Sequence, residues 1–299
     1  MSIEQITYRL LRAIIALLGF IPLKIAQFIG KMAGTLAFMV PFARKEIALE
    51  NIRCSLDGGM TRGQAEIQLK KVYLHFGQMF LEVPHVMRLR PRNVNEYLAI
   101  DHEENLVNAL AKGRGVLALT AHLGNWELMS TAVAMRFGNL AVVVRPLDFK
   151  PAEKLMVDLR SRYGTEIIPA HRGMRHIMRA VRRNKIIGIL LDQNVDWYEG
   201  AFVDFLGRPA CSNKGLALIA LKTGAPVVPF FSVRDEVGRY RIMIGEEVPL
   251  LRTGDKTKDV EENTALFTKV IESYVRQYPD QWFWFHNRWK TKNYCEIKD

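Results

Sequence analysis

The sequence predicts an α/β fold, with a mostly parallel or mixed central sheet flanked by helices and an apolar helical segment at the N-terminus. After Arg90-Pro91, short apolar runs rich in β-branched residues alternate with segments of helical periodicity. Such alternation is typical of strands joined by helical crossovers, with the sheet buried on both faces. The N-terminal prediction depends on residues 1–43, which form the most apolar part of the chain.

The N-terminal segment has the pattern of helices that lie in a membrane interface. Lys24 and Lys31 interrupt its apolar runs, and none reaches the roughly 18 residues of a spanning helix. Glu4 precedes the apolar part, unlike in a signal peptide. Interfacial helices with basic side chains toward the headgroups fit best, with a tilted spanning helix or two buried helices as alternatives. We therefore expect a membrane-associated segment, residues 1–43, and a second domain, residues 44–299.

The remaining elements follow from periodicity and from turn residues. Residues 47–82 have a helical pattern that Gly58-Gly59 interrupts, and Pro84 is expected to end the second helix near Glu82. Apolar runs predict buried strands, and apolar residues at three- and four-residue spacing predict helices. The strands are expected over 116–121, 140–144, 186–191, 227–233 and 240–244, and the helices over 127–137, 151–163, 174–185, 214–223 and 260–278.

Composition and cysteine usage fit a folded protein in a reducing compartment. The chain has 299 residues, of which 49% are hydrophobic and 24% are charged, enough for one large core or two smaller ones. Cys54, Cys211 and Cys295 are far apart and form no C-x-x-C pair. Neither a zinc ribbon nor a disulfide framework is therefore expected.

Positive charge is concentrated in one part of the chain. The net charge is +11, and residues 145–185 hold eleven Lys or Arg against four acids. Such a surface attracts an anionic partner. The helix expected in this region places basic residues opposite an apolar stripe, which fits either a solvated face or a docking surface for an acidic partner. A nucleic-acid partner is not expected, because no recognition motif occurs and the apolar N-terminus would be unexplained. The basic residues are Arg172, Arg175, Arg179, Arg182 and Arg183.

Polar residues follow three of the predicted strands. His122, Arg145 and Asp192 come directly after apolar runs. In α/β sheets, ligands gather outside the carboxyl ends of the strands. These three residues are therefore candidates for a common rim, although a polar residue at a strand end can also mark only the point where the strand meets solvent.

The segment from His122 to Glu127 carries the sharpest chemical signal. If the strand ends at His122, Gly124 turns the chain and Asn125 caps the next helix, Glu127 falls in the first helical turn and can fold back on the imidazole. A carboxylate on one ring nitrogen makes the other nitrogen a better base. The same spacing also fits a plain helix start with a capping acid. Neither G-x-S-x-G nor H-E-x-x-H occurs, and we expect neither a metal nor a cofactor.

Several blocks in the same order resemble the lipid A biosynthesis acyltransferase family, the late lauroyl and myristoyl transferases within the glycerolipid and lysophospholipid acyltransferase superfamily. The resemblance covers about residues 44–290. The family signature is a histidine, four residues and an acidic residue, which His122 and Glu127 match. The other matching blocks are 51–53 (NIR), the helix after Thr61, 188–193 (GILLDQ), 200–207 (GAFVDFLG), 221–229 (LKTGAPVVP) and 281–290 (QWFWFHNRWK).

The resemblance implies roles for individual residues. His122 would be the general base that takes the proton from an acceptor hydroxyl, with Glu127 holding and polarising it, and the hydroxyl oxygen would attack an acyl thioester. Asp192 matches the family's aspartate. The family's arginine corresponds to Arg160 or Arg162, with Arg160 favoured. Further candidates for substrate binding are Asn125, Arg145, Arg162, Arg175 and Arg179.

The resemblance also implies partners and a location. The donor would be acyl carrier protein, which is acidic, or acyl-CoA, and the acceptor would be a hydroxyl or hydroxyacyl group of a lipid A precursor. The location would be the cytoplasmic face of a bacterial inner membrane. One alternative is an acyltransferase for another glycolipid or a lysophospholipid, and a less favoured one is a non-catalytic protein that binds anionic lipid. Of Trp282, Trp284 and Trp289, at least one is expected in the core and the others at the bilayer interface.

Overall fold

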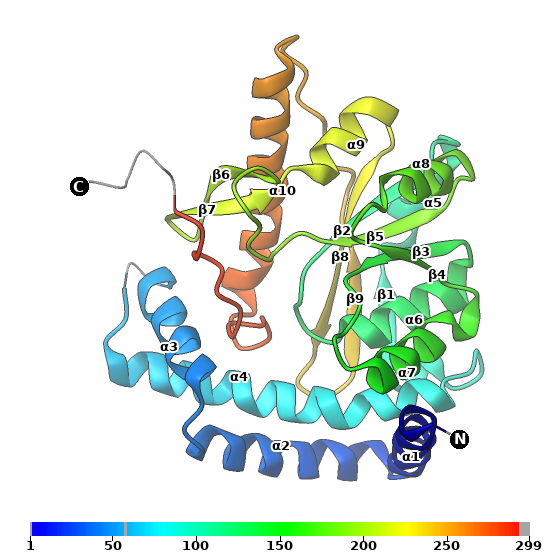
Figure 1. The fold of residues 1–299 in the computed structure, drawn as a ribbon, viewed down its shortest axis with the longest axis vertical. Coiled ribbons are helices and arrows are strands. Elements are labelled where there is room, and N and C mark those ends of the chain that lie inside the picture. The colour runs from blue at the N-terminus through cyan, green and yellow to red at the C-terminus, as the bar shows by residue number, and fades with distance from the viewer. Residues whose placement is uncertain (1, 57–58, 293–299) are drawn as a thin grey trace.

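A seven-stranded sheet forms the centre of the fold, in the order β1-β9-β8-β2-β5-β3-β4 (Figure 1). The computed structural model describes residues 2–56 and 59–292. Every pairing in this sheet is parallel except β8–β9. The predicted mixed α/β sheet is therefore confirmed. Its strands are β1 (Leu98–Asp101), β2 (Val116–Thr120), β3 (Leu140–Val144), β4 (Glu166–Pro169), β5 (Ile186–Leu190), β8 (Val227–Arg234) and β9 (Tyr240–Ile244).

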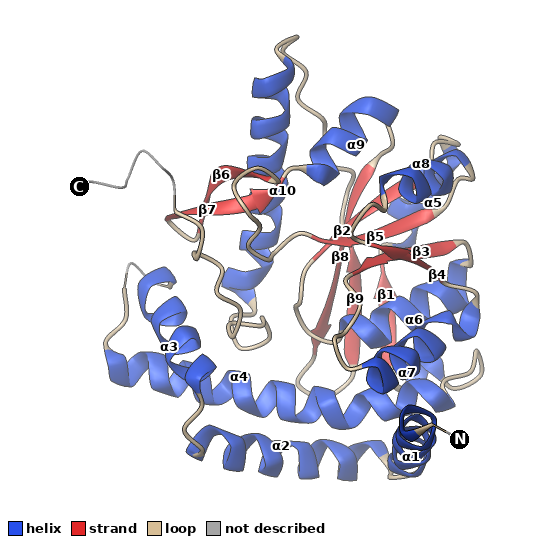
Figure 2. Cartoon of the chain, in the orientation of Figure 1, coloured by secondary structure: helices blue, strands red, loops and turns tan. Residues whose placement is uncertain are grey.

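Helices cover both faces of the sheet, as Figure 2 shows. Along β2, Leu117 and Leu119 belong to one apolar core, and Val116 and Ala118 belong to the other. Neighbouring side chains of a strand point to opposite faces, so β2 is buried on both sides and reads as a continuous apolar run. One face carries α5 (Glu103–Ala111), α6 (Trp126–Phe137) and α7 (Lys150–Arg160), and the other carries α8 (Met174–Arg182), α9 (Gly215–Thr223) and α10 (Lys256–Gln277).

Four helices precede the sheet: α1 (Ile3–Leu18), α2 (Leu23–Met39), α3 (Ala43–Ser55) and α4 (Arg62–Glu82). Helix α2 lies along α4, and α1 lies beside α7 (Figure 1). The backbones of α2 and α4 approach closely at glycines. A Cβ atom on Gly34 would lie 2.3 Å from the carbonyl oxygen of Tyr73, and one on Gly77 would lie 2.2 Å from that of Gly30. Any larger residue would therefore push the two helices apart.

Neither N-terminal helix alone has the length and hydropathy to cross a bilayer, and the same holds for every other helix in the described part of the chain. Taken together, α1 and α2 pass by length and composition, but they meet at a bend of 115°.

Some elements differ from the sequence prediction. The structure adds β1, β4, α5 and a separate antiparallel hairpin of β6 (Gly200–Phe205) and β7 (Arg208–Asn213). Helix α8 begins at Met174, as expected, but it ends at Arg182 before the predicted end at Lys185, and Asn184 takes a left-handed conformation with φ +53°. Helix α4 ends at Glu82, as expected, and Pro84 lies in the short 3₁₀ helix η1 (Val83–Arg88). The remaining 3₁₀ turns are η2 (Val94–Glu96) and η3 (Ser161–Tyr163).

Candidate active site

His122 and Asp192 meet at the carboxyl ends of two neighbouring strands. Strands β2 and β5 pair in parallel with Thr120 opposite Leu190, so the residues two positions beyond each strand leave the sheet side by side. The Nδ1 atom of His122 lies 2.8 Å from Oδ1 of Asp192. The backbone N–H of His122 donates to Oδ2 of the same carboxylate at 2.9 Å. One aspartate therefore holds both the ring and the backbone of His122.

This contact keeps Asp192 ionised and fixes the tautomer of His122. Burial opposes the charge on Asp192, but the charge of His122, the hydrogen bonds from its ring and backbone and the indole of Trp282 outweigh it, and the pKa of Asp192 falls to about 2. The ionised carboxylate accepts a hydrogen bond from Nδ1–H, so the lone pair of the neutral imidazole lies on Nε2. The His122 side chain is 23% exposed. The ring can therefore act as a base toward a bound hydroxyl.

Glu127 has a different partner from the one expected. Its Oε2 accepts a hydrogen bond from Nε of Arg160 at 2.9 Å, and its Oε1 accepts one from Nη2 of Arg160 and one from Nε1 of Trp126. No hydrogen bond or ion pair joins Glu127 to His122 in the described structure. The contact expected from Glu127 is thus made by Asp192, because the first turn of α6 directs Glu127 toward α7.

The two candidate arginines separate clearly. Arg160 forms a bidentate ion pair with Glu127, and both side chains are largely buried. Arg162 is exposed and donates to the backbone carbonyl of Met87. Of the two, Arg160 is the one that the fold pairs with Glu127.

The His122 loop (residues 121–125) is fixed from several sides. Gly124 has φ +63°, and a Cβ atom there would lie 1.6 Å from the carbonyl oxygen of Ser232. Asn125 caps α6 as expected, with its Oδ1 accepting the N–H of Leu128 at 3.0 Å. Asn125 is fully buried, so we assign it this structural role in place of the predicted substrate contact. Burial lowers the pKa of His75 to about 3, and its neutral ring contacts the Gly124 carbonyl.

The C-terminal segment (residues 281–288) forms the back of the site. The backbone N–H of Gly124 donates to the carbonyl of Gln281 at 2.9 Å, and that of Phe283 donates to the carbonyl of His122 at 3.0 Å. The indole N–H of Trp282 donates to Oδ2 of Asp192 at 2.7 Å. This segment therefore pairs with the His122 loop along its backbone and contacts Asp192 through a side chain, which sequence reasoning missed.

The tryptophans of this region are all in the core. Trp282, Trp284 and Trp289 are 1%, 0% and 6% exposed. The expectation that some of them lie at a bilayer interface is wrong, because the C-terminal segment is enclosed between the sheet, α4 and the β6–β7 hairpin. Asn51 of α3 also donates to the carbonyls of Trp284 and His286, so α3 holds this segment from the other side.

Besides Asp192, the side chains of Trp126, Gln193 and Phe283 border the imidazole ring of His122. Trp126 meets it edge to face, with ring centroids 5.0 Å apart. The amide nitrogen of Gln193 lies 3.4 Å from Nε2 and 3.5 Å from Nδ1. An atom so near to both nitrogens in the ring plane would overlap the carbon between them, so the amide lies over the face of the ring. The in-plane lone pair of Nε2 therefore does not point at this amide.

The other predicted binding residues lie apart from this pair. Arg145 is exposed after β3, and Arg175 and Arg179 are exposed on α8. Within residues 2–56 and 59–292, none of these three side chains has a hydrogen bond or ion pair to His122, Glu127 or Asp192. Over the same residues, no three His, Cys, Asp or Glu side chains are grouped so that they could hold a metal ion. Cys295 lies outside the described residues.

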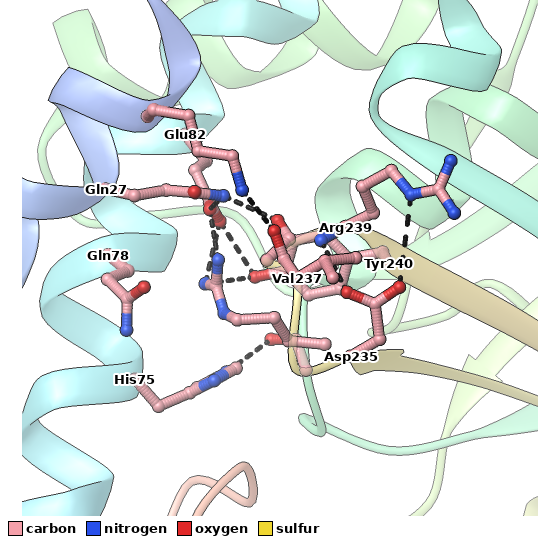
Figure 3. A network of polar contacts seen from close by, with 12 residues as sticks. Gln27, His75, Gln78, Glu82, Asp235, Val237, Arg239 and Tyr240 are labelled. Carbon is pink, nitrogen blue, oxygen red and sulfur yellow. Dashed lines mark hydrogen bonds and ion pairs between the residues drawn. The ribbon is translucent and has the colours of Figure 1, made fainter.

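A buried polar network joins helices α2 and α4 to strands β8 and β9 (Figure 3). Glu82 of α4 accepts hydrogen bonds from Gln27 of α2, from the hydroxyl of Tyr240 and, at both oxygens, from Arg234. The backbone of Arg234 exchanges two hydrogen bonds with the side chain of Gln281, at 2.7 and 3.0 Å. Since the Gln281 carbonyl accepts the N–H of Gly124, one connected set of contacts runs from α2 to the His122 loop.

Comparison with known proteins identifies the family of this chain. A family model described as bacterial lipid A biosynthesis acyltransferase matches residues 3–291. A lipid A biosynthesis acyltransferase of Haemophilus influenzae is 22% identical over 92% of this chain and 85% of its own length, and a lipid A biosynthesis palmitoleoyltransferase of Escherichia coli is 21% identical over 91% and 87%. A phosphatidylinositol mannoside acyltransferase of Mycobacterium tuberculosis is 26% identical over 52% of the chain, and the chain spans about half (50%) of that relative's length. The chain belongs to the bacterial lipid A biosynthesis acyltransferase family.

Proposed function

We propose that this protein is an O-acyltransferase that moves a fatty acyl group from a thioester to a hydroxyl group of a membrane lipid. The observation that carries the proposal is the pairing of His122 with the buried carboxylate of Asp192 at the carboxyl edge of the sheet. A histidine held in this way is a general base, and the family is one of acyltransferases. The alternative of a non-catalytic lipid-binding protein gives no reason for a partly exposed imidazole on a buried carboxylate.

The proposed reaction proceeds in two steps on the His122 ring. Nε2 accepts the proton of the acceptor hydroxyl while its oxygen attacks the thioester carbonyl carbon, giving a tetrahedral oxyanion and an imidazolium. The carbon–sulfur bond then breaks, the thiolate takes the proton from Nε2, and the ester and the free thiol leave. Asp192 stabilises the imidazolium between the two steps. The Gln193 amide, over the ring face, is placed to donate a hydrogen bond to the oxyanion.

Glu127 and Arg160 have a supporting place in this scheme. Their ion pair ties the first turn of α6, which follows the His122 loop, to α7. The side chains are 10% and 18% exposed, and removing one partner of a pair so well shielded leaves an uncompensated charge. We therefore propose that the pair fixes the start of α6, and with it Trp126, beside the site. A contact of Arg160 with substrate stays a prediction.

We further propose that the outer face of α1 and α2 lies in a membrane interface. The face of α2 opposite α4 and one side of α1 expose large apolar side chains, and Arg9, Arg12 and Lys31 are exposed among them. Apolar side chains bordered by basic ones suit the headgroup region of an anionic bilayer. A location at the cytoplasmic face of a bacterial inner membrane would bring the site to its lipid acceptor. The exposed side chains are Ile3, Ile6, Leu10, Ile14, Leu17, Phe20, Ile25, Phe28, Ile29, Met32, Leu36 and Met39.

Replacing Leu10, Ile14 and Leu17 by serine is expected to weaken binding to phosphatidylglycerol vesicles by roughly tenfold or more, since buried apolar area drives insertion. The measurement is co-sedimentation with vesicles. Serine at Leu218 and Leu251, which are exposed on other parts of the protein, is the matched control. Surface substitutions are preferable to deleting residues 1–43, because that deletion would uncover the glycine seam between α2 and α4. Equal binding of both variants would contradict an interfacial α1.

The donor is proposed to be acyl carrier protein, with acyl-CoA as the alternative, because Arg175 and Arg179 expose positive charge on α8. Changing both to glutamate is expected to raise the KM for the carrier-bound donor several-fold and to flatten its salt dependence. The KM for acyl-CoA should change much less. Lys222→Glu with Lys256→Glu, which changes the net charge equally elsewhere, is the control. Equal effects on both donors would place the role of α8 in folding or in acceptor binding.

The acceptor is proposed to be a lipid A precursor, and a phosphatidylinositol mannoside or another glycolipid is the second candidate. Relatives with each activity are similar to this chain. The deciding experiment incubates the protein with an acyl thioester and each acceptor in mixed micelles and identifies the products by mass spectrometry. Addition of one acyl group to the lipids of one acceptor class would identify that class as the substrate. Binding of lipid with no product from any acceptor, a lysophospholipid included, would support the non-catalytic alternative.

A further inference from the structure

We infer that Trp282 is a positioning residue whose indole N–H holds the Asp192 carboxylate in place beneath His122. The inference rests on the proposed function, since it assigns a part in the same reaction. Trp282 lies 90 residues from Asp192 in the sequence and belongs to the C-terminal segment, which follows α10 and pairs with the His122 loop.

The Asp192 carboxylate accepts hydrogen bonds from three donors. Oδ1 receives the ring Nδ1–H of His122, and Oδ2 receives both the backbone N–H of His122 and the indole N–H of Trp282. The residue is 3% exposed, so water cannot easily replace a missing donor. Because Trp282 and the backbone together fix Oδ2, Oδ1 stays directed at the imidazole.

Trp282 is itself held in one pose. Its ring packs edge to face against Trp284 and Phe205, with centroid distances of 4.6 and 5.4 Å. Its backbone forms a bridge with Leu123 of the His122 loop. The same residue therefore contacts the loop through its main chain and the carboxylate through its side chain, which fixes the distance between the two halves of the pair.

Loss of the indole N–H removes one of the two donors to Oδ2, so the carboxylate can rotate away from the imidazole. The Nδ1–H of His122 is then held less firmly, and the Nε2 lone pair is directed less well at the acceptor hydroxyl. The loss therefore falls on kcat, because the imidazole acts mainly in the transition state.

Trp282→Phe tests this, with Trp284→Phe as the matched control. Trp284 is equally buried in the same segment, but its indole N–H donates to the carbonyl of Pro279. Trp282→Phe is expected to lower kcat by roughly 10- to 100-fold, in line with losing a hydrogen bond to a charged group. The KM values should stay near the wild-type values, since the loss falls on the chemical step. Trp284→Phe should lose similar stability and keep the wild-type kcat.

Equal losses of kcat in the two variants would reduce Trp282 to a core residue and overturn the inference. If Trp282→Phe does not fold, the indole ¹H–¹⁵N resonances of the Asp192→Asn protein answer the same question. The Trp282 resonance should move and the Trp284 resonance should stay, and an unmoved Trp282 resonance would contradict the contact. A wild-type protein inactive on every acceptor would instead overturn the proposed function, and the resonance test would still apply.

Discussion

Replacing His122 with alanine is expected to lower kcat for acyl transfer by about 10²- to 10⁴-fold, which is what a positioned general base contributes. The side chain is partly exposed at the edge of the sheet, so the fold should survive, and a thermal melt checks this. KM should change little, because the imidazole acts mainly in the transition state. His171→Ala, in the exposed turn before α8, is the control. Near-normal turnover of His122→Ala would exclude this residue as the base.

Asp192→Asn is expected to cost about 10³- to 10⁴-fold in kcat, because it reverses the tautomer of the imidazole. The amide N–H₂ of asparagine would face Nδ1, so Nδ1 would accept and Nε2 would carry the proton. Nε2 would then have no lone pair with which to take the proton of the acceptor hydroxyl. Asp255→Asn is the control, since asparagine caps α10 as well as aspartate does. In the double variant with His122→Ala, the losses should not add, because the carboxylate acts through the imidazole. Additive losses would mean that the two residues work separately.

The same carboxylate links stability to pH. The pKa of Asp192 falls from 3.8 to about 2 on folding, so its contribution to the free energy of unfolding is present above about pH 4 and is lost as the pH falls toward 2. At neutral pH the Asp192 carboxylate is fully ionised, so its contribution to the free energy of unfolding is complete. The Asp192→Asn protein lacks this contribution and should therefore unfold at a lower temperature at pH 7, where the wild-type protein has its full benefit.

Local sequence patterns predicted most of the secondary structure that surrounds the site. The apolar run 116–121 gave a strand buried on both faces, and Gly124 and Asn125 gave the turn and the cap that begin α6. Polar residues after strands pointed to His122 and Asp192 as a rim, and these two do meet. Each of these predictions depends only on neighbouring residues or on a general property of parallel sheets.

Contacts between distant segments were not predictable in the same way. The partner of His122 depends on the register of β2 against β5, which sets Thr120 opposite Leu190, and no spacing within the His122 loop reveals it. The sequence therefore placed Glu127 on the imidazole, where the fold places Asp192. The tryptophans of the C-terminal segment were expected partly at a membrane for a related reason. An aromatic and basic run looks the same whether it faces lipid or, like Trp282, closes the back of a buried site.

The most direct test of the account is acceptor-dependent release of free thiol from an acyl thioester, measured together with the acylated lipid. The wild-type protein is expected to release one thiol for each ester formed, and only when a lipid with a free hydroxyl is present. The His122→Ala and Asp192→Asn proteins should lose both signals together. Equal thiol release without an acceptor would identify a thioesterase, and no release with any acceptor would contradict an acyl transfer based on His122 and Asp192.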